Sequence, residues 1–260
     1  MCRKAFIDMK KSIAFFLILS VILLSLASCT MQGSADPDAT QGTQPESDST
    51  SQSDVPDVPD ITPLTPETVS VSPKADEDDK GSGMHYTEFV LRTPDRDITF
   101  SGRMFVYSEN KIYVEDLTGD GYPEAVVIFE RDRGTGVHVE EVHVFDGRTL
   151  AEYPVEDMIK TLNGYLELSS DDEDFIIRIS ESTYRISKSS LPGDHDKRFD
   201  KVSLGFIDRY SVSGGTLTYT TECMFDPWLY HGAIRATLEF NGDGFVFQSA
   251  LYDEEGLFSE

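Results

Sequence analysis

The sequence has few cysteines and few basic residues. Its three cysteines, Cys2, Cys29 and Cys223, exclude a disulfide framework, because the first two belong to the N-terminal leader region described below. We expect Cys223 to be a small buried apolar residue. Lys and Arg number 22 against 47 Asp and Glu, which gives a formal net charge of −25. Such a surface excludes nucleic acid as a ligand and attracts cations and basic partners.

Sequence motifs of catalysis are also lacking. The serines form no G-x-S-x-G elbow, and Cys223 has no local catalytic signature. Carboxylates are so numerous that some pair always lies close enough to imitate a glycosidase site. We therefore expect a domain that is not an enzyme, and keep an extracellular hydrolase with a carboxylate pair as the alternative.

The first 28 residues have the three-part layout of a signal peptide. A basic segment with Arg3, Lys4, Lys10 and Lys11 precedes an apolar run over residues 13–26 that is short for a bilayer span. The following Leu26-Ala27-Ser28-Cys29 resembles the lipobox of bacterial prolipoproteins. The resemblance implies that Cys29 is acylated and becomes the mature N-terminus, anchored on the extracytoplasmic face of the cell membrane by its acyl chains.

Residues 29–84 have the composition of a disordered acidic stalk. They are rich in Ser, Thr, Asp, Glu and Pro, and no aromatic residue occurs after Cys29 until Tyr86. Such a segment buries too little apolar surface to offset its ordering entropy. We therefore expect one folded domain over residues 85–260.

The domain has a period-two apolar pattern, which indicates half-buried antiparallel strands. One short helix is expected from Val155 to Leu162, with Pro154 in its first turn and Gly164 at its end. The fold class is therefore mainly β, either an antiparallel sandwich or a partly open twisted sheet. We expect strands over residues 86–92, 98–104, 111–115, 125–130, 137–145, 175–179, 183–187, 202–210, 216–223, 234–240 and 245–251.

One loop between two expected strands has oxygen-bearing side chains at alternate positions. Asp116, Thr118, Asp120 and Glu124, with the carbonyl of Tyr122, can curl around a hard cation such as Ca²⁺. The alternative is a metal-free loop held by carboxylate-to-amide hydrogen bonds.

The stretch over residues 116–147, DLTGDGYPEAVVIFERDRGTGVHVEEVHVFDG, resembles the VCBS or FG-GAP-type repeat proteins of bacteria. In that family such loops hold calcium or brace a sheet, in surface proteins of adhesion or recognition. The resemblance assigns the carboxylate positions to Asp116, Asp120 and Glu124. Thr118 departs from the usual Asn or Asp, which weakens the expected calcium site.

Four polar residues lie on the expected strand over residues 137–145. His138 and Glu140 fall on one face, and Glu141 and His143 on the other. Each face offers only two metal ligands, so we expect solvated surface residues.

An aromatic segment contains Phe225, Trp228 and Tyr230. It is either a recognition loop for an extracellular protein or glycan, or a plug at one end of the sheet against Phe206 or Tyr210. The function that we expect is extracellular binding by a surface lipoprotein. A sensor or accessory subunit of a membrane complex is a further alternative.

Replacing Cys29 with serine tests the anchor. We expect Cys29→Ser to abolish metabolic labelling with a fatty acid, because acylation needs the thiol, and to release the protein into the medium or leave it unprocessed. Cys2→Ser is the matched control and should keep the label, because Cys2 leaves with the signal peptide. Unchanged lipid labelling of Cys29→Ser would contradict the anchor.

Overall fold

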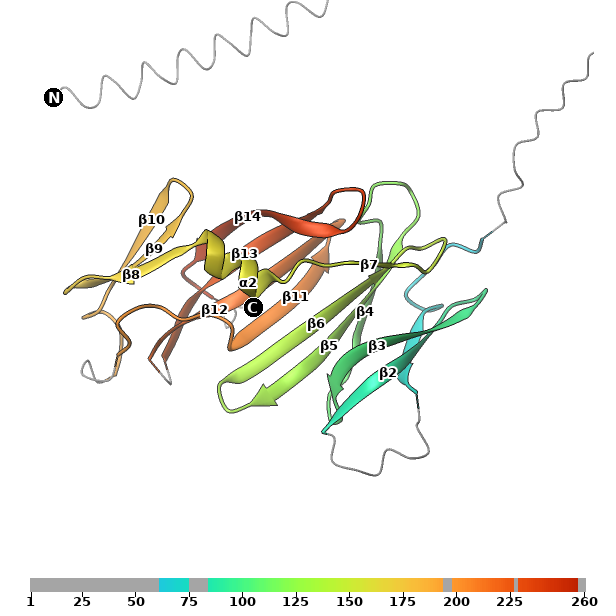
Figure 1. Cartoon of the computed structure of the whole chain (residues 1–260), viewed down its shortest axis with the longest axis horizontal. Coiled ribbons are helices and arrows are strands. Elements are labelled where there is room, and N and C mark those ends of the chain that lie inside the picture. The colour runs from blue at the N-terminus through green and yellow to red at the C-terminus, as the bar shows by residue number, and fades with distance from the viewer. Residues whose placement is uncertain (1–60, 75–83, 194–197, 227–228, 257–260) are drawn as a thin grey trace, which may run out of the picture. The chain divides into compact units, whose positions relative to one another are not determined.

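The computed structural model describes residues 61–74, 84–193, 198–226 and 229–256, which belong to one compact unit. The predicted signal peptide, Cys29, Trp228 and most of the predicted stalk lie outside these residues. The described part is mainly β, as the sequence predicts, with open sheets and one helix (Figure 1). A helix with the length and apolar character of a membrane span is absent from it.

The strands form three sheets. A small antiparallel sheet consists of β1 (Ser70–Pro73), β2 (His85–Arg92) and β3 (Asp97–Phe105). A second one consists of β8 (Glu167–Ser170), β9 (Asp174–Ile179) and β10 (Ser182–Ser187). The large sheet contains β4 (Lys111–Glu115), β5 (Glu124–Gly134), β6 (Val137–Phe145), β7 (Glu152–Tyr153), β11 (Ile207–Ser213), β12 (Thr216–Asp226), β13 (Leu229–Phe240) and β14 (Phe245–Asp253).

The large sheet has the strand order β14–β13–β12–β11–β6–β5–β4, and β7 pairs with β6. All its ladders are antiparallel except the one between β6 and β11, which is parallel. The sheet therefore joins two antiparallel groups, β4–β7 and β11–β14, along one parallel ladder (Figure 1). The strands are antiparallel as predicted, except at this one ladder. Parallel neighbours need a long crossover, and residues 146–206 supply it.

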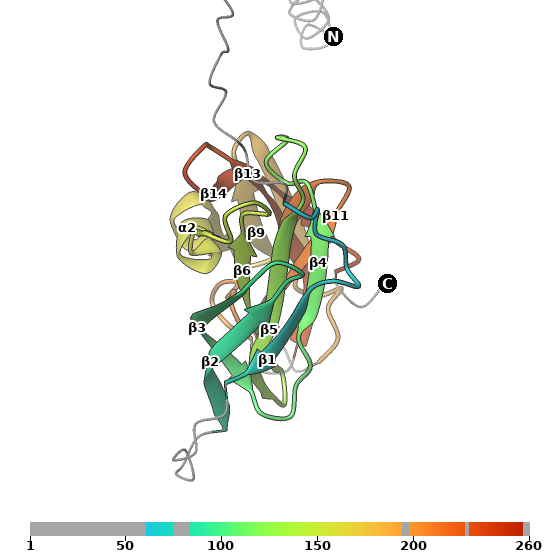
Figure 2. The same ribbon diagram turned by 90° about the vertical axis from the view of Figure 1, so that its right-hand side faces the viewer.

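Strand β5 is buried on both faces over its first six residues, not half-buried as predicted. Ala125, Val127 and Phe129 pack against the β1–β3 sheet, where they contact the core around Phe89 and Phe100. Figure 2 shows this small sheet lying over β5. The alternate residues of β5 face a second core, so β5 connects the two apolar clusters.

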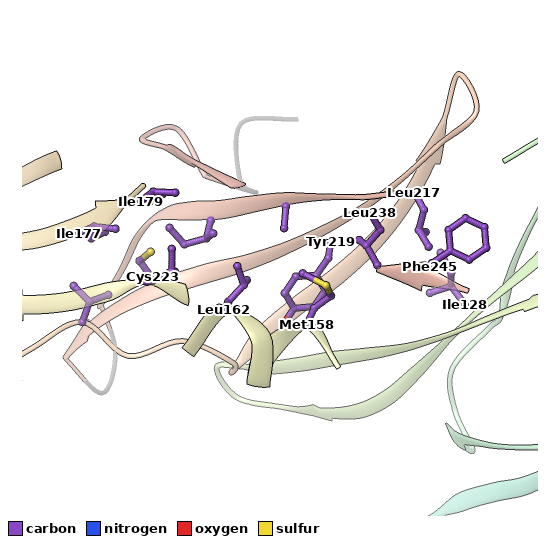
Figure 3. Packing of buried hydrophobic residues seen from close by; sticks show 14 of the residues in the cluster. Ile128, Met158, Leu162, Ile177, Ile179, Leu217, Tyr219, Cys223, Leu238 and Phe245 are labelled. Atoms are coloured by element: carbon purple, nitrogen blue, oxygen red, sulfur yellow. The ribbon is translucent and has the colours of Figure 1, made fainter. Parts of the chain in front are cut away.

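The second core lies between the large sheet, the helix α2 (Met158–Tyr165) and the β8–β10 sheet. Met158 and Leu162 of α2 pack there with Ile177 of β9 and with residues of β12–β14 (Figure 3). Cys223 is a fully buried free thiol in this core, which confirms its predicted role. Burial stabilises each large apolar side chain by roughly 1.5–3 kcal/mol, so this core fixes α2 on the sheet.

The helix begins later than predicted. Asp157 caps it, because its carboxylate accepts a hydrogen bond from the Lys160 amide at 3.1 Å. Val155, expected in the first turn, instead forms a bridge with Phe245 of β14. Gly164 does not end the helix, which continues to Tyr165. Pairing with β14 therefore overrides the helical spacing at residue 155.

The folded part begins before residue 85. Leu64 and Val69 are buried in the β1–β3 core, and β1 pairs with β2 from Ser70 opposite Arg92 to Pro73 opposite Phe89. The predicted disordered stalk is therefore wrong for residues 61–74. The average composition hides these few apolar residues, whose burial offsets the local ordering entropy.

The strand bounds differ from the prediction in several places. Three strands are longer than predicted, because β5 continues to Gly134, β12 continues to Asp226 and β13 begins at Leu229. Residues 202–206, predicted as strand, precede β11, and Gly205 has a φ of +92°, which interrupts an extended chain. The strands β1, β7 and β8 are not predicted. With two to four residues each, they are too short to show a period of two.

His143 is a buried charged group in the β1–β3 core. Its Nδ1 lies 2.7 Å from Glu152 Oε1, and its Nε2 lies 3.1 Å from Glu141 Oε1. Burial acts to lower the pKa of His143, but the two carboxylates outweigh it and raise the pKa to about 9. Gly102 of β3 makes room for the ring, because a Cβ there would lie 2.7 Å from His143 Nε2.

Stability should therefore fall at alkaline pH. A folded-state pKa of about 9, above the ordinary value of 6.5, gives stability that is fully present below pH 6.5 and is lost as pH rises through 9. The loss should approach about 3 kcal/mol at most, less solvent screening of the partly exposed carboxylates. Denaturant unfolding at a series of pH values from 6.5 to above 9 measures this loss of stability. His143→Gln should flatten the curve, and an equal fall in that variant would contradict the assignment.

Candidate functional site

The parallel ladder between β6 and β11 is short. It contains only Ile207 opposite His138 and Asp208 opposite Val139, although both strands continue beyond these residues. We call this junction the seam. Beyond it, the Tyr210 amide donates to Glu140 Oε2 at 2.7 Å. A side-chain carboxylate of β6 therefore replaces the next ladder partner of β11.

Glu140 is fixed by three donors. Besides the Tyr210 amide, Lys111 Nζ lies 2.7 Å and His138 Nε2 lies 3.1 Å from its Oε1, and its side chain is only 1% exposed. Burial acts to raise the pKa of Glu140, but the hydrogen bonds from His138, Lys111 and the Tyr210 amide outweigh it and lower the pKa. The carboxylate is therefore charged and serves as a connection between β4, β6 and β11.

Glu140 and His143 are buried, so the prediction of solvated residues on this strand is wrong. The predicted division into two faces holds, because His138 contacts Glu140 and Glu141 contacts His143. The period of two assigns each residue to a face. It does not predict that both faces are covered. Here Lys111 of β4 and the Tyr210 amide of β11 cover Glu140, and β3 covers His143.

A pocket of about 420 Å³ lies beside the seam. It is within the roughly 300–1,000 Å³ that small-molecule sites occupy. Its walls come from β5, β6, β11, β12 and the segment that leads into α2. The lining residues are Arg131, Val139, Glu140, Glu141, Val142, Val155, Glu156, Asp157, Met158, Ile159, Asp208, Tyr210 and Tyr219.

Two buried polar groups in this pocket lack partners. Asp208 is 4% exposed and Tyr219 is 2% exposed. Within the described part of the chain, neither Asp208 Oδ1 nor the Tyr219 hydroxyl has a hydrogen-bond partner of good geometry. The two groups are close enough that each acts on the pKa of the other as a hydrogen-bond partner. Burial raises the pKa of Asp208, against the opposing effects of nearby hydroxyls and of Arg131 and His138. Burial and the neighbouring Asp208 also raise the pKa of Tyr219.

The sequence does not single out Asp208 or Tyr219. Asp208 lies inside a segment predicted as an ordinary alternating strand, and Tyr219 lies inside another. The sequence offers one signal for this pocket. Asp208 is a charged residue within an otherwise apolar strand segment, and Tyr219 is central in the next one. The long-range seam, which makes the two residues pocket walls, leaves no local pattern.

The predicted cation loop is braced by its own hydrogen bonds. Asp116 accepts from the Gly119 and Gly121 amides at 2.8 and 2.9 Å. Glu124 accepts from the Leu117 amide at 2.7 Å and from the Thr118 amide and hydroxyl, each at 3.2 Å. These bonds brace the loop without a cation, although each carboxylate oxygen keeps a further lone pair.

Arg148 supplies positive charge at the same loop. Its Nη2 lies 2.7 Å from Asp120 Oδ2, and its guanidinium lies 4.8 Å from the centre of the Tyr122 ring. The Tyr122 amide donates to Asp120 Oδ1 at 2.9 Å. Among the described residues, no three acidic, His or Cys side chains are grouped as a metal site. These contacts hold the loop without a metal, and the calcium site stays a prediction.

The aromatic segment is divided between core and surface. Phe225 is fully buried against Phe175, with ring centres 4.8 Å apart, so it is unavailable as a recognition residue. Tyr230 donates to the Gly136 carbonyl at 2.6 Å and thereby ties β13 to the β5–β6 turn. Trp228 is outside the described residues. The prediction that Phe225 is a recognition residue is therefore wrong.

No protein-family model, curated protein or solved structure matches this chain. The resemblance of residues 116–147 to VCBS or FG-GAP-type proteins stays a prediction.

Replacing Asp116 tests how the loop is held. Asp116→Ala removes the acceptor for two amides, so we expect a loss of about 1–2 kcal/mol in unfolding free energy, equal in EDTA and in millimolar calcium. Thermal melts under both conditions measure it. A calcium-dependent rise in the melting temperature of the unsubstituted chain, abolished by Asp120→Ala, would instead support the cation.

Proposed function

We propose that the protein is an exported, lipid-anchored binding protein whose β domain takes its ligand in the pocket at the seam. The signal-peptide layout and Cys29 support the anchor, and the acidic segment after Cys29 supports a domain held away from the membrane. The ligand group is of a size that the pocket can enclose, such as a small molecule or one unit of an extracellular protein or glycan.

The observation that carries this proposal is the pair of buried polar atoms without partners. Leaving a buried donor or acceptor unsatisfied costs about 1–3 kcal/mol. Native proteins avoid this cost except where a group serves another purpose. The residues Asp208 and Tyr219 line the same pocket, so one ligand that reaches the two buried atoms can satisfy both.

A hydrolase is the second candidate. Glu140 and Asp208 line one pocket and their pKa values shift in opposite directions, which is the pattern of an acid–base pair. However, a base or nucleophile needs a lone pair aimed at the substrate. Both oxygens of Glu140 already accept hydrogen bonds, from Lys111, His138 and the Tyr210 amide. We therefore favour binding over catalysis, in a free-standing protein or in a sensor or accessory subunit.

Removing a hydroxyl from the pocket tests the proposal without knowledge of the ligand. Tyr219→Phe should raise the unfolding free energy by about 1 kcal/mol, because it removes an unsatisfied group and leaves the ring in place. Tyr153→Phe is the matched control. Its hydroxyl donates to Asp146 Oδ2 at 2.6 Å, so its loss should destabilise the protein by about 1 kcal/mol.

Denaturant unfolding of both variants at neutral pH gives the comparison. If Tyr219→Phe destabilises the protein as much as Tyr153→Phe, the hydroxyl has a structural role and the binding proposal loses its support.

A further inference from the structure

The charges of the pocket are unequal. Among its carboxylates, Glu140 is matched by Lys111 and His138, and Glu141 by His143. The one cationic side chain in the lining, Arg131, lies 3.0 Å from Asp132. Glu156, Asp157 and Asp208 have no Lys, Arg or His within ion-pair distance in the described part of the chain. The pocket is therefore short of positive charge.

The hydrogen-bonding capacity of the pocket is mainly that of an acceptor. Asp208 Oδ1 can accept, and the Tyr219 hydroxyl can accept through its oxygen while its proton faces the neighbouring Asp208. An alkylammonium group has three donors and no acceptor, so it complements both atoms. A carboxylate or phosphate would meet repulsion from the unmatched carboxylates. A neutral hydroxyl would satisfy the acceptors but not the charge.

The aromatic wall suits the same group. The rings of Tyr210 and Tyr219 contact each other with centres 5.1 Å apart, and both line the pocket. Ring faces attract cations, and the alkyl stem next to an ammonium group packs well on them. Val142, Val155 and Ile159 add apolar surface for such a stem.

We infer that the pocket at the seam binds a primary alkylammonium group, with Asp208 Oδ1 and the Tyr219 hydroxyl as acceptors and the two tyrosine rings as its wall. This inference rests on the proposed function and adds the ligand class. The group comes either from a free diamine or from a lysine side chain of an extracellular polypeptide. The chemistry at the pocket is the same for both.

Calorimetric titration of the full-length chain in detergent tests the inference. The probes are cadaverine for the free diamine and N-acetyl-lysine methylamide for the lysine side chain, with pentanediol and glutarate as neutral and anionic counterparts of similar length. We expect at least one of the ammonium probes to bind about tenfold or more tightly than pentanediol, and glutarate not to bind. The tighter ammonium probe identifies the source.

Two variants and one control locate the site. Asp208→Asn should weaken ammonium binding about tenfold or more, and Tyr219→Phe should weaken it severalfold. Glu167→Gln removes a carboxylate of β8 that is 64% exposed and paired with Arg178 of β9, and it should leave the affinity unchanged. An equal loss in Asp208→Asn and in Glu167→Gln would show attraction to the overall negative charge and would overturn the inference.

Failure of the ligand class is separable from failure of the binding proposal. Absence of ammonium binding up to about 10 mM, or equal binding of pentanediol, would overturn the alkylammonium inference. In either case a stabilising Tyr219→Phe would still support a pocket for another ligand. A destabilising Tyr219→Phe would count against the pocket itself.

Discussion

The parallel ladder between β6 and β11 is the constraint on which the rest of the structure depends. Only two residue pairs join the two antiparallel groups of the large sheet, and the chain returns to this position after a crossover of about sixty residues. Backbone groups that lose ladder partners in a buried place need other ones. Glu140 meets this need at Tyr210, and Lys111 and His138 hold its charge. One carboxylate thus connects β4, β6 and β11 where backbone pairing ends.

The pocket follows from that same junction. The backbones of β6 and β11 stop pairing after Asp208, so a gap opens between the two strands. The segment before α2 forms the opposite wall of the pocket. Asp208 and Tyr219 are therefore placed by neighbouring strands, which hold side chains more rigidly than loops do. The two cores on either side of β5 stiffen this frame further. For the proposed ligand, such a frame is preorganised, so little binding free energy is lost in ordering it.

Sequence patterns predict the local features of this fold and miss the long-range ones. The bounds of β4 and β6 agree with the prediction, because alternating residues end there at turns rich in Gly and Asp. The parallel pairing of β6 with β11 has no local signature. For the same reason, Glu140 reads as a surface residue, although Lys111 of β4, His138 of β6 and the Tyr210 amide of β11 surround its carboxylate. The β4–β5 loop shows the opposite case: its spacing suits a cation, yet the Arg148 that pairs with Asp120 comes from a turn more than twenty residues away.

The acidity of the chain and the chemistry of the pocket act at different ranges. A net charge of −25 raises the concentration of cations near the surface, but salt screens this attraction beyond about 8 Å. Long-range charge therefore favours every cation and selects none. Selection of one cation over another needs short-range contacts with fixed geometry. The exposed carboxylates offer few such contacts, because solvent already satisfies them. Asp208 and Tyr219 differ in that they are buried while Asp208 Oδ1 and the Tyr219 hydroxyl have no partner of good hydrogen-bond geometry among the described residues. A ligand that donates to both recovers this lost interaction, which a surface ion pair cannot provide.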